Sequence, residues 1–222
     1  MAENAQAPTP PRVPSELSRV EPAALEDEQR LADASLLASV LAEQRASDVA
    51  FVGASLSDVD LSGSQLVKLQ IVDCELHGGN LANVTAEGAA LSRVRIDGAR
   101  LTGLALLDAA LTDVTISGCR VDLASFAGSR LRRVSFEDCV LARTDFLEAQ
   151  LESVRFHRCE LVGADFRGAR MRRCELRRNE LADLRGVASL AGAAMERGDV
   201  LAMAWALAAT LGIGVLEDDE PG

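Results

Sequence analysis

The sequence predicts an all-β solenoid, because three regularities hold together between residues 49 and 183. First, every fifth residue from Phe51 to Leu181 is a large apolar residue, Ala86 excepted, in unbroken register over 27 positions. Second, the residue two places before each of these is almost always small or aliphatic, and this set contains all five cysteines. Third, no member of either set is charged, so every Asp, Glu, Lys and Arg of this stretch falls on the other three positions.

A five-residue period differs from the 3.6-residue period of an amphipathic helix and from the two-residue alternation of a long strand. Residues i and i−2 of an extended segment share one face. Each unit therefore buries one large and one small side chain, exposes the other three, and then turns. Units of this kind stack into a solenoid in which each coil contacts only its neighbours and both ends need caps.

Units such as Ala164-Asp165-Phe166-Arg167-Gly168 carry a family pattern. Residues 49–185 resemble the pentapeptide-repeat proteins, whose unit is Ala-(Asp/Asn)-Leu-X-X. The resemblance implies a right-handed quadrilateral β-helix with four units per turn, and thus nearly seven turns for the 27 units. A 20-residue period agrees with four sides, since Phe126, Phe146 and Phe166 are 20 residues apart and should stack in one column.

The two ends lack the repeat, and we expect short α-helical caps on both. Residues 1–22 are predicted to be a disordered tail and 23–47 an N-terminal capping helix, 48–187 the β-helix, and 188–222 a C-terminal capping and dimerisation helix with an acidic tail. The N-terminal helix prediction rests on Pro22, which suits a helix start, and on an apolar stripe formed by Leu25, Leu31, Leu37, Val40 and Leu41.

The C-terminal segment from Val200 to Leu211 follows Asp199, a candidate N-cap, and is apolar on almost every side. A helix of this kind should be buried all round. One face can cover the last coil. The other face then needs a partner, and a second copy of the chain, meeting it at Met203, Trp205 and Leu207, is the simplest. The alternative is a helix folded into its own cap.

Charge is distributed unevenly. The net charge of −11 comes mainly from residues 1–48 and 186–222, each at −5, while residues 49–185 carry −1. Six arginines are predicted to lie on one face, two coils apart: Arg130, Arg132, Arg133, Arg170, Arg172 and Arg173. Guanidinium groups in such a strip can grip phosphates or carboxylates. The alternative is a solvated face neutralised by nearby acids.

Catalytic and metal-binding patterns are missing from the sequence, which has no Gly-rich phosphate loop, nucleophile elbow or metal-spaced His/Cys cluster. Cys119, Cys139 and Cys159 are expected to stack inside the core as small hydrophobes. His77 and His157 should lie four coils apart. The sequence therefore predicts no catalytic residue, no cofactor and no metal.

A non-enzymatic binding or scaffold protein with an unknown protein partner is thus the predicted function. The alternative, drawn from the resemblance, is a DNA mimic that modulates DNA gyrase, as the quinolone-resistance members of the family do. A duplex carries one negative charge per ~1.7 Å, whereas the repeat region nets only −1. We expect no direct nucleic-acid binding. No segment resembles a signal peptide or a membrane span, so a cytoplasmic protein without membrane contact is predicted.

Overall fold

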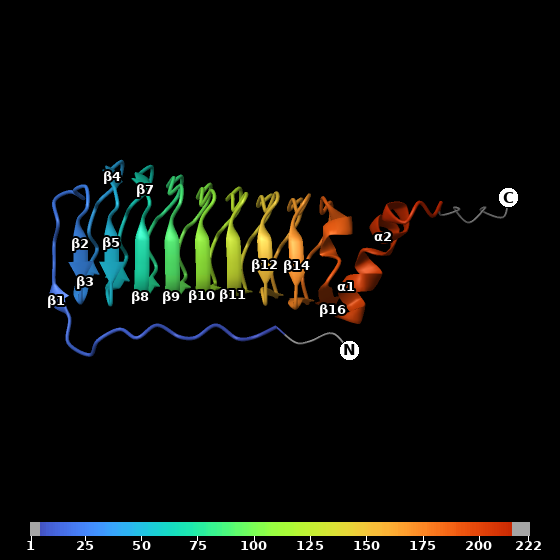
Figure 1. The fold of residues 1–222 in the computed structure, drawn as a ribbon, viewed down its shortest axis with the longest axis horizontal. Coiled ribbons are helices and arrows are strands. Elements are labelled where there is room, and N and C mark those ends of the chain that lie inside the picture. Colours follow the sequence, from blue (N-terminus) through green and yellow to red (C-terminus); the bar gives the residue numbers. More distant parts are fainter. Residues whose placement is uncertain (1–4, 215–222) are drawn as a thin grey trace.

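The computed structural model describes residues 5–214 as one long rod, in which short parallel strands lie side by side along the axis (Figure 1). Ten strands pair in the order β1-β3-β6-β8-β9-β10-β11-β13-β15-β16 and give about nine turns. The strands are β1 (Ser18–Arg19), β2 (Arg30–Ala32), β3 (Ala34–Leu37), β4 (Arg45–Ser47), β5 (Ala50–Val52), β6 (Ser55–Ser57), β7 (Gln65–Val67), β8 (Gln70–His77), β9 (Ala90–Asp97), β10 (Ala110–Ser117), β11 (Arg130–Glu137), β12 (Gln150–Glu152), β13 (Arg155–His157), β14 (Arg170–Arg172), β15 (Cys174–Arg177) and β16 (Ala193–Met195).

The predicted four-sided coil is confirmed by the strand register. Strands β8 to β11 each turn one corner, so they supply two sides, and Val94 pairs with Val114 and then with Val134. The other two sides are held by single parallel bridges at 20-residue spacing, such as Asn80 to Arg100 and Thr85 to Ala105. Twenty residues per turn over four sides gives one five-residue unit per side.

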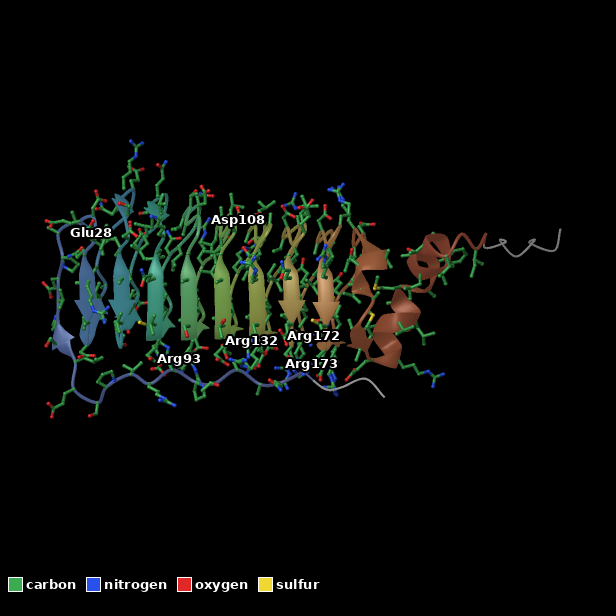
Figure 2. The ribbon with its side chains drawn as sticks, in the orientation of Figure 1. Glu28, Arg93, Asp108, Arg132, Arg172 and Arg173 are labelled. Atoms are coloured by element: carbon green, nitrogen blue, oxygen red, sulfur yellow. The ribbon has the colours of Figure 1, made fainter. Side chains whose placement is uncertain are left out.

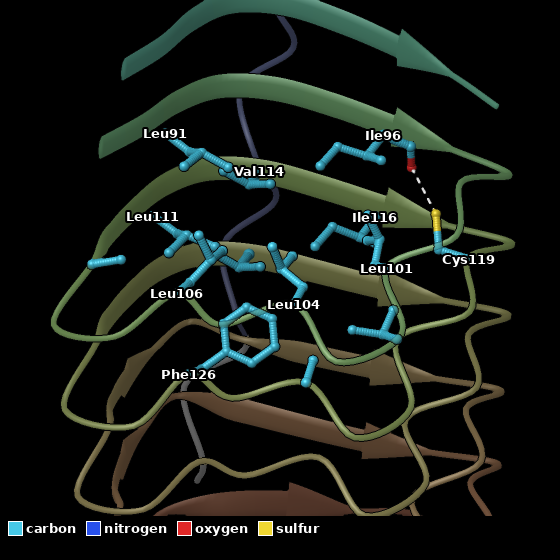
Figure 3. Close-up of a cluster of buried hydrophobic side chains, with 14 of the residues drawn as sticks. Leu91, Ile96, Leu101, Leu104, Leu106, Leu111, Val114, Ile116, Cys119 and Phe126 are labelled. Atoms are coloured by element: carbon cyan, nitrogen blue, oxygen red, sulfur yellow. Dashed lines mark hydrogen bonds between the residues drawn. The ribbon is translucent and has the colours of Figure 1, made fainter. Parts of the chain in front are cut away.

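The core is formed by the two uncharged sets that the sequence singled out, as the close-up of the middle coils shows (Figure 3). Phe146 stacks on Phe126 with ring centroids 5.2 Å apart and on Phe166 at 4.8 Å. Phe136 and Phe156 stack at 5.2 Å in a neighbouring column, and rings of the two columns meet edge to face. The predicted phenylalanine columns are therefore present.

The five cysteines are buried in the small-residue set. The Cys119 thiol donates to the carbonyl oxygen of Ile96 (Figure 3), and Cys139 and Cys159 repeat this contact with Ile116 and Phe136. Burial raises the pKa of the Cys74 thiol to about 11, so that thiol is protonated at neutral pH. These side chains act as small hydrophobes with a weak donor.

The predicted helix over residues 23–47 is wrong, because β2, β3 and β4 occupy this stretch. The five-residue register simply continues backward through the buried Leu41, Leu36 and Leu31. Leu37 and Val40, two members of the expected helical stripe, are 49% and 76% exposed. The helical and five-residue patterns share Leu31 and Leu41, which is why the stripe was misleading.

This N-terminal coil gives a direct test. We expect Leu41→Ala to lower the free energy of unfolding by about 2–5 kcal/mol, because the Leu41 side chain is fully buried and its removal leaves a cavity. Val40→Ala, one residue away and mostly exposed, should change it by less than about 0.5 kcal/mol. Urea denaturation of the two variants measures both. A helix in this stretch would make Val40 as sensitive as Leu41.

The predicted disordered tail over residues 1–22 is also wrong where the structure describes it. Residues 5–17 are extended and run back along the outside of the rod to β1, which pairs with β3 (Figure 1). We call residues 5–17 the N-terminal strap. The solenoid therefore begins earlier than residue 48, and about nine turns replace the expected seven.

The C-terminal end is closed by a short 3₁₀ helix, η1 (Val187–Leu190), by β16, and by two short helices, α1 (Arg197–Ala202) and α2 (Ala204–Thr210). Since β16 still pairs with β15, coiling continues beyond the predicted end at residue 187. Asp199 lies within α1, and its side chain is buried and accepts the backbone N–H of Asn179. Most of the acidic tail, 215–222, lies outside the described residues.

No helix within residues 5–214 is long and apolar enough to cross a bilayer.

Candidate functional site

The arginine strip, defined as the six arginines Arg130, Arg132, Arg133, Arg170, Arg172 and Arg173, occupies one side of the rod and the corner beside it. Arg130 is in register with Arg170 through Gln150, and Arg132 with Arg172 through Glu152. Figure 2 shows Arg132, Arg172 and Arg173 along the same edge of the rod as the strap. The predicted two-coil spacing is therefore correct.

Three arginines of the strip are held in ion pairs. The Glu152 carboxylate accepts hydrogen bonds from both Arg172 and Arg173, the latter at 2.6 Å. Arg133 pairs with Asp113 at 2.6 Å. The other three, Arg130, Arg132 and Arg170, are exposed, and none of them forms an ion pair with any residue between 5 and 214. The exposed half of the strip is thus the part whose charge is not paired within residues 5–214.

The corner next to this side carries alternating charge. We call the corner row the residues 33, 53, 73, 93, 113, 133, 153 and 173, each at 20-residue spacing and with φ near +50 to +60°. In this row the Arg93 guanidinium donates two hydrogen bonds of 2.6 Å to the Asp73 carboxylate, and Arg133 donates two of 2.6 Å to Asp113. Two-pronged contacts of this type are strong and geometrically specific.

The N-terminal strap lies on this corner row. The backbone N–H of Thr9 donates to Asp113 at 2.9 Å, and that of Arg12 to Asp73 at 3.1 Å. Farther along, the N–H of Ala5 donates to Glu175 at 2.9 Å. A side chain at Gly53 would clash with Asp33 and crowd Pro14, so glycine leaves room for the strap at this corner.

The two aspartates under the strap are stabilised as anions. The Arg93 guanidinium, together with the N–H of Arg12, holds the pKa of Asp73 below its usual value. Arg133 and the N–H of Thr9 lower the pKa of Asp113 from 3.8 to about 2. Both carboxylates are therefore charged at any physiological pH.

This pKa shift predicts acid sensitivity. Because the folded pKa of Asp113 is depressed, its contribution to stability is present above pH 3.8 and lost as the pH falls toward 2. We expect the difference in unfolding free energy between wild type and Asp113→Asn to shrink by about 2 kcal/mol between pH 6 and pH 2. Urea denaturation at both pH values measures it, and an unchanged difference would contradict the ion pair.

Sequence reasoning missed the strap and its two aspartates. A signal for the ion pairs was present, since Asp73 and Arg93, like Asp113 and Arg133, are 20 residues apart and hence stacked in successive coils. The strap contacts use backbone N–H groups, which leave no side-chain pattern beyond the spacing of the prolines. Glu152, which lies between Arg132 and Arg172 in the register, pairs with both Arg172 and Arg173.

The three residues of the predicted dimer contact differ in their exposure to solvent. Met203 is 3% exposed and belongs to the core, and Leu207 is half-buried against it. Trp205 is 63% exposed. It belongs to α2 but does not line the apolar groove of about 540 Å³ at this end, which is formed by η1, β16 and the two helices, with Val187, Leu190, Met195, Val200, Leu207 and Leu211 among its residues. We call this groove together with Trp205 the C-terminal apolar surface.

The two histidines lie far apart on the surface. His77 sits 3.6 Å from both Glu75 and Asp97, and His157 lies against Arg158. A polar pocket of about 170 Å³ beside His157 includes Glu175, whose carboxylate already holds Ala5 and Arg177. Within residues 5–214 no group of three or more His, Cys, Asp or Glu side chains is arranged to hold a metal ion.

The sequence profile of the family described as "Pentapeptide repeat region" matches residues 89–166 and 109–185. HetL, a pentapeptide repeat protein involved in heterocyst differentiation regulation from the cyanobacterium Nostoc sp. strain PCC 7120, shares the fold at a TM-score of 0.53 with 19% identity, over 82% of this chain and 91% of HetL. Together with the four-sided coil, these matches define the class of the fold: residues 89–185 match the pentapeptide-repeat family, and the coil is that of a pentapeptide-repeat protein.

QnrB1, a plasmid-mediated fluoroquinolone resistance protein, aligns at a TM-score of 0.48 and 18% identity, over 89% of this chain and 99% of QnrB1. No curated protein matches the chain in sequence.

Proposed function

We propose that the protein is a non-enzymatic binding protein whose exposed strip arginines, Arg130, Arg132 and Arg170, bind an acidic surface of a protein partner. One observation carries this proposal: these three guanidinium groups are exposed and form no ion pair among residues 5–214, while the other three arginines of the strip are neutralised.

The scaffold suits such a role. Arg130 and Arg170 are two coils apart on a regular parallel ladder, so their spacing is set by the backbone at roughly 10 Å. Long arginine side chains on a rigid base lose less freedom when they bind than the same residues on a loop would. Carboxylate or phosphate groups on a partner are the acceptors that guanidinium groups bind in pairs.

A decaglutamate peptide is a suitable probe of this strip. We expect it to bind the wild-type protein in a salt-dependent way, and the triple variant Arg130→Glu, Arg132→Glu, Arg170→Glu to lose at least tenfold in affinity. The matched control, Arg100→Glu, Arg143→Glu, Arg185→Glu, changes the net charge equally on other parts of the rod. Isothermal titration calorimetry measures the three affinities. An equal loss of affinity in the two triple variants would contradict the proposal.

We also propose that the C-terminal apolar surface joins two copies of the chain. Leu211 lines the groove, Leu201 and Trp205 belong to the two helices that contribute to its wall, and all three side chains are largely exposed. Large apolar side chains gathered in this way mark an interaction site, and a two-fold contact lets the same surface cover itself. Trp205 is the anchor in this proposal, because Met203 is already used in the core.

A second proposal, with less support, is that the protein mimics DNA and in this way modulates DNA gyrase. A mimic needs dense negative charge, yet residues 49–185 net −1, and three arginines of one side are exposed. A gyrase supercoiling assay at micromolar protein separates the two proposals: inhibition, or protection from a quinolone, would favour mimicry over the strip.

A further inference from the structure

We propose that the corner row is a binding site for an extended, proline-rich peptide, and that the N-terminal strap of the same chain is its resident ligand. The strap reads Ala5-Gln6-Ala7-Pro8-Thr9-Pro10-Pro11-Arg12-Val13-Pro14. Proline fixes φ near −65° and favours the polyproline II conformation. The four prolines therefore hold the strap in the extended form in which it lies along the rod.

The length of one polyproline II turn matches the distance between the two acceptor aspartates. Polyproline II has three residues per turn and rises about 3.1 Å per residue, so Thr9 and Arg12 are one turn, or about 9.3 Å, apart. Asp113 and Asp73, their acceptors, are two coils apart, which is about 9.6 Å at the strand spacing. In this part of the corner row aspartates alternate with arginines, so a carboxylate occurs in every second coil.

From Ala5 to Arg12, burial follows the same three-residue period, which ends there because Val13 is half-buried and Pro14 is exposed. Ala5 is buried and Pro8 and Pro11 are half-buried, while the Thr9 and Arg12 side chains are exposed. One face of the extended segment thus packs on the rod. The two hydrogen bonds come from backbone N–H groups, so recognition requires alanine or proline at the packed positions and a non-proline residue at the donor positions. The Thr9 side chain also interacts with Asp113, and the Arg12 charge with Asp73.

The site is organised by the solenoid and not by the strap. Arg93 and Arg133 each grip the carboxylate of the preceding coil with two contacts of 2.6 Å. Because these contacts come from the solenoid alone, we expect them to hold Asp73 and Asp113 in place whether or not a peptide is bound. Arg155, whose guanidinium donates to the carbonyl of Ala5, and Glu175 close the far end. A preformed site of this kind can exchange one proline-rich segment for another.

Hydrogen exchange tests the resident contact on the full chain. The Thr9 and Arg12 amides should exchange slowly in the wild type, and at least tenfold faster in Asp73→Gly, Asp113→Gly. Glycine suits these corners because their φ is positive. Asp138→Gly is the matched control: it removes the same kind of carboxylate–arginine pair, with Arg158, on a corner that the strap does not touch. Equal exchange in all three proteins would overturn the proposal.

Peptide binding tests the site itself. In the full-chain variant Pro8→Gly, Pro10→Gly, Pro11→Gly the strap becomes flexible and competes poorly, while the corner row is unaltered. A fluorescent peptide of residues 5–17 should bind this variant at least tenfold more tightly than the wild type. A second peptide carrying Thr9→Pro and Arg12→Pro stays extended but lacks both N–H donors together with the Thr9 and Arg12 side chains, and it should bind at least tenfold more weakly than the first.

No binding of the first peptide to the triple-glycine variant, or equal binding of the two peptides, would refute the assignment. Because the second peptide changes only the ligand, this comparison remains decisive even if the aspartate variants fold poorly.

Discussion

Replacing Phe146 with alanine should lower the free energy of unfolding by about 3–5 kcal/mol, because a fully buried ring is removed from the middle of a column. Phe146 stacks on Phe126 and Phe166 and meets Phe136 and Phe156 edge to face at 6.2 and 5.6 Å. Neighbouring coils are locked by a 20-residue register and cannot move in to fill the space. The cost of the cavity should therefore be close to its full value.

The measurement is equilibrium urea denaturation followed by circular dichroism, with Leu147→Ala as the matched control. Leu147 is the next residue and partly exposed, so its truncation should cost less than about 1 kcal/mol. If Phe146→Ala also lost less than about 1 kcal/mol, the phenylalanine column would not be a principal part of the core.

Replacing Trp205 with glutamate should halve the mass of the particle in solution. The proposal of a homodimer places Trp205 at the centre of the contact, where a buried carboxylate without a partner is strongly unfavourable. Because Trp205 lies largely exposed on the single chain, the variant should keep its fold. Light scattering should then give twice 23.5 kDa for the wild type and 23.5 kDa for the variant.

Val67→Glu is the control for this experiment, since it places the same charge on another exposed apolar residue, in β7. It should remain dimeric. A wild type that is already a monomer, or a Trp205→Glu variant that remains a dimer, would rule out this contact and leave α2 as a cap of the last coil alone.

The sequence predicted the coil well wherever the pattern came from buried side chains. A five-residue period determines which residues face inward, and a 20-residue period determines which residues stack, so the phenylalanine columns and the buried cysteines followed directly. The first coils were misassigned because Leu31 and Leu41 fit a helical stripe as well as the repeat. The exposure of Val40 and Leu37 shows which pattern the chain follows.

The strap could not be predicted in this way. Its hydrogen bonds join Thr9 to Asp113 and Arg12 to Asp73, more than 60 residues apart in sequence, and they use backbone groups that every non-proline residue has. The sequence predicted the two-coil spacing of the arginine strip correctly, but Arg133 and Arg173 lie at the corner beside the other four. The division into paired and exposed arginines depends on side-chain geometry. Only the structure shows that Glu152 neutralises Arg172 and Arg173 while Arg130 is left exposed.

The function of the strip is tested most directly by NMR of the arginine side chains in the wild-type protein. When decaglutamate is added, the Nε–Hε signals of Arg130, Arg132 and Arg170 should shift, because these are the exposed guanidinium groups of the strip. The signals of Arg100 and Arg143, on other parts of the rod, should stay in place. Shifts confined to Arg100 and Arg143, or equal shifts at all five arginines, would contradict the account.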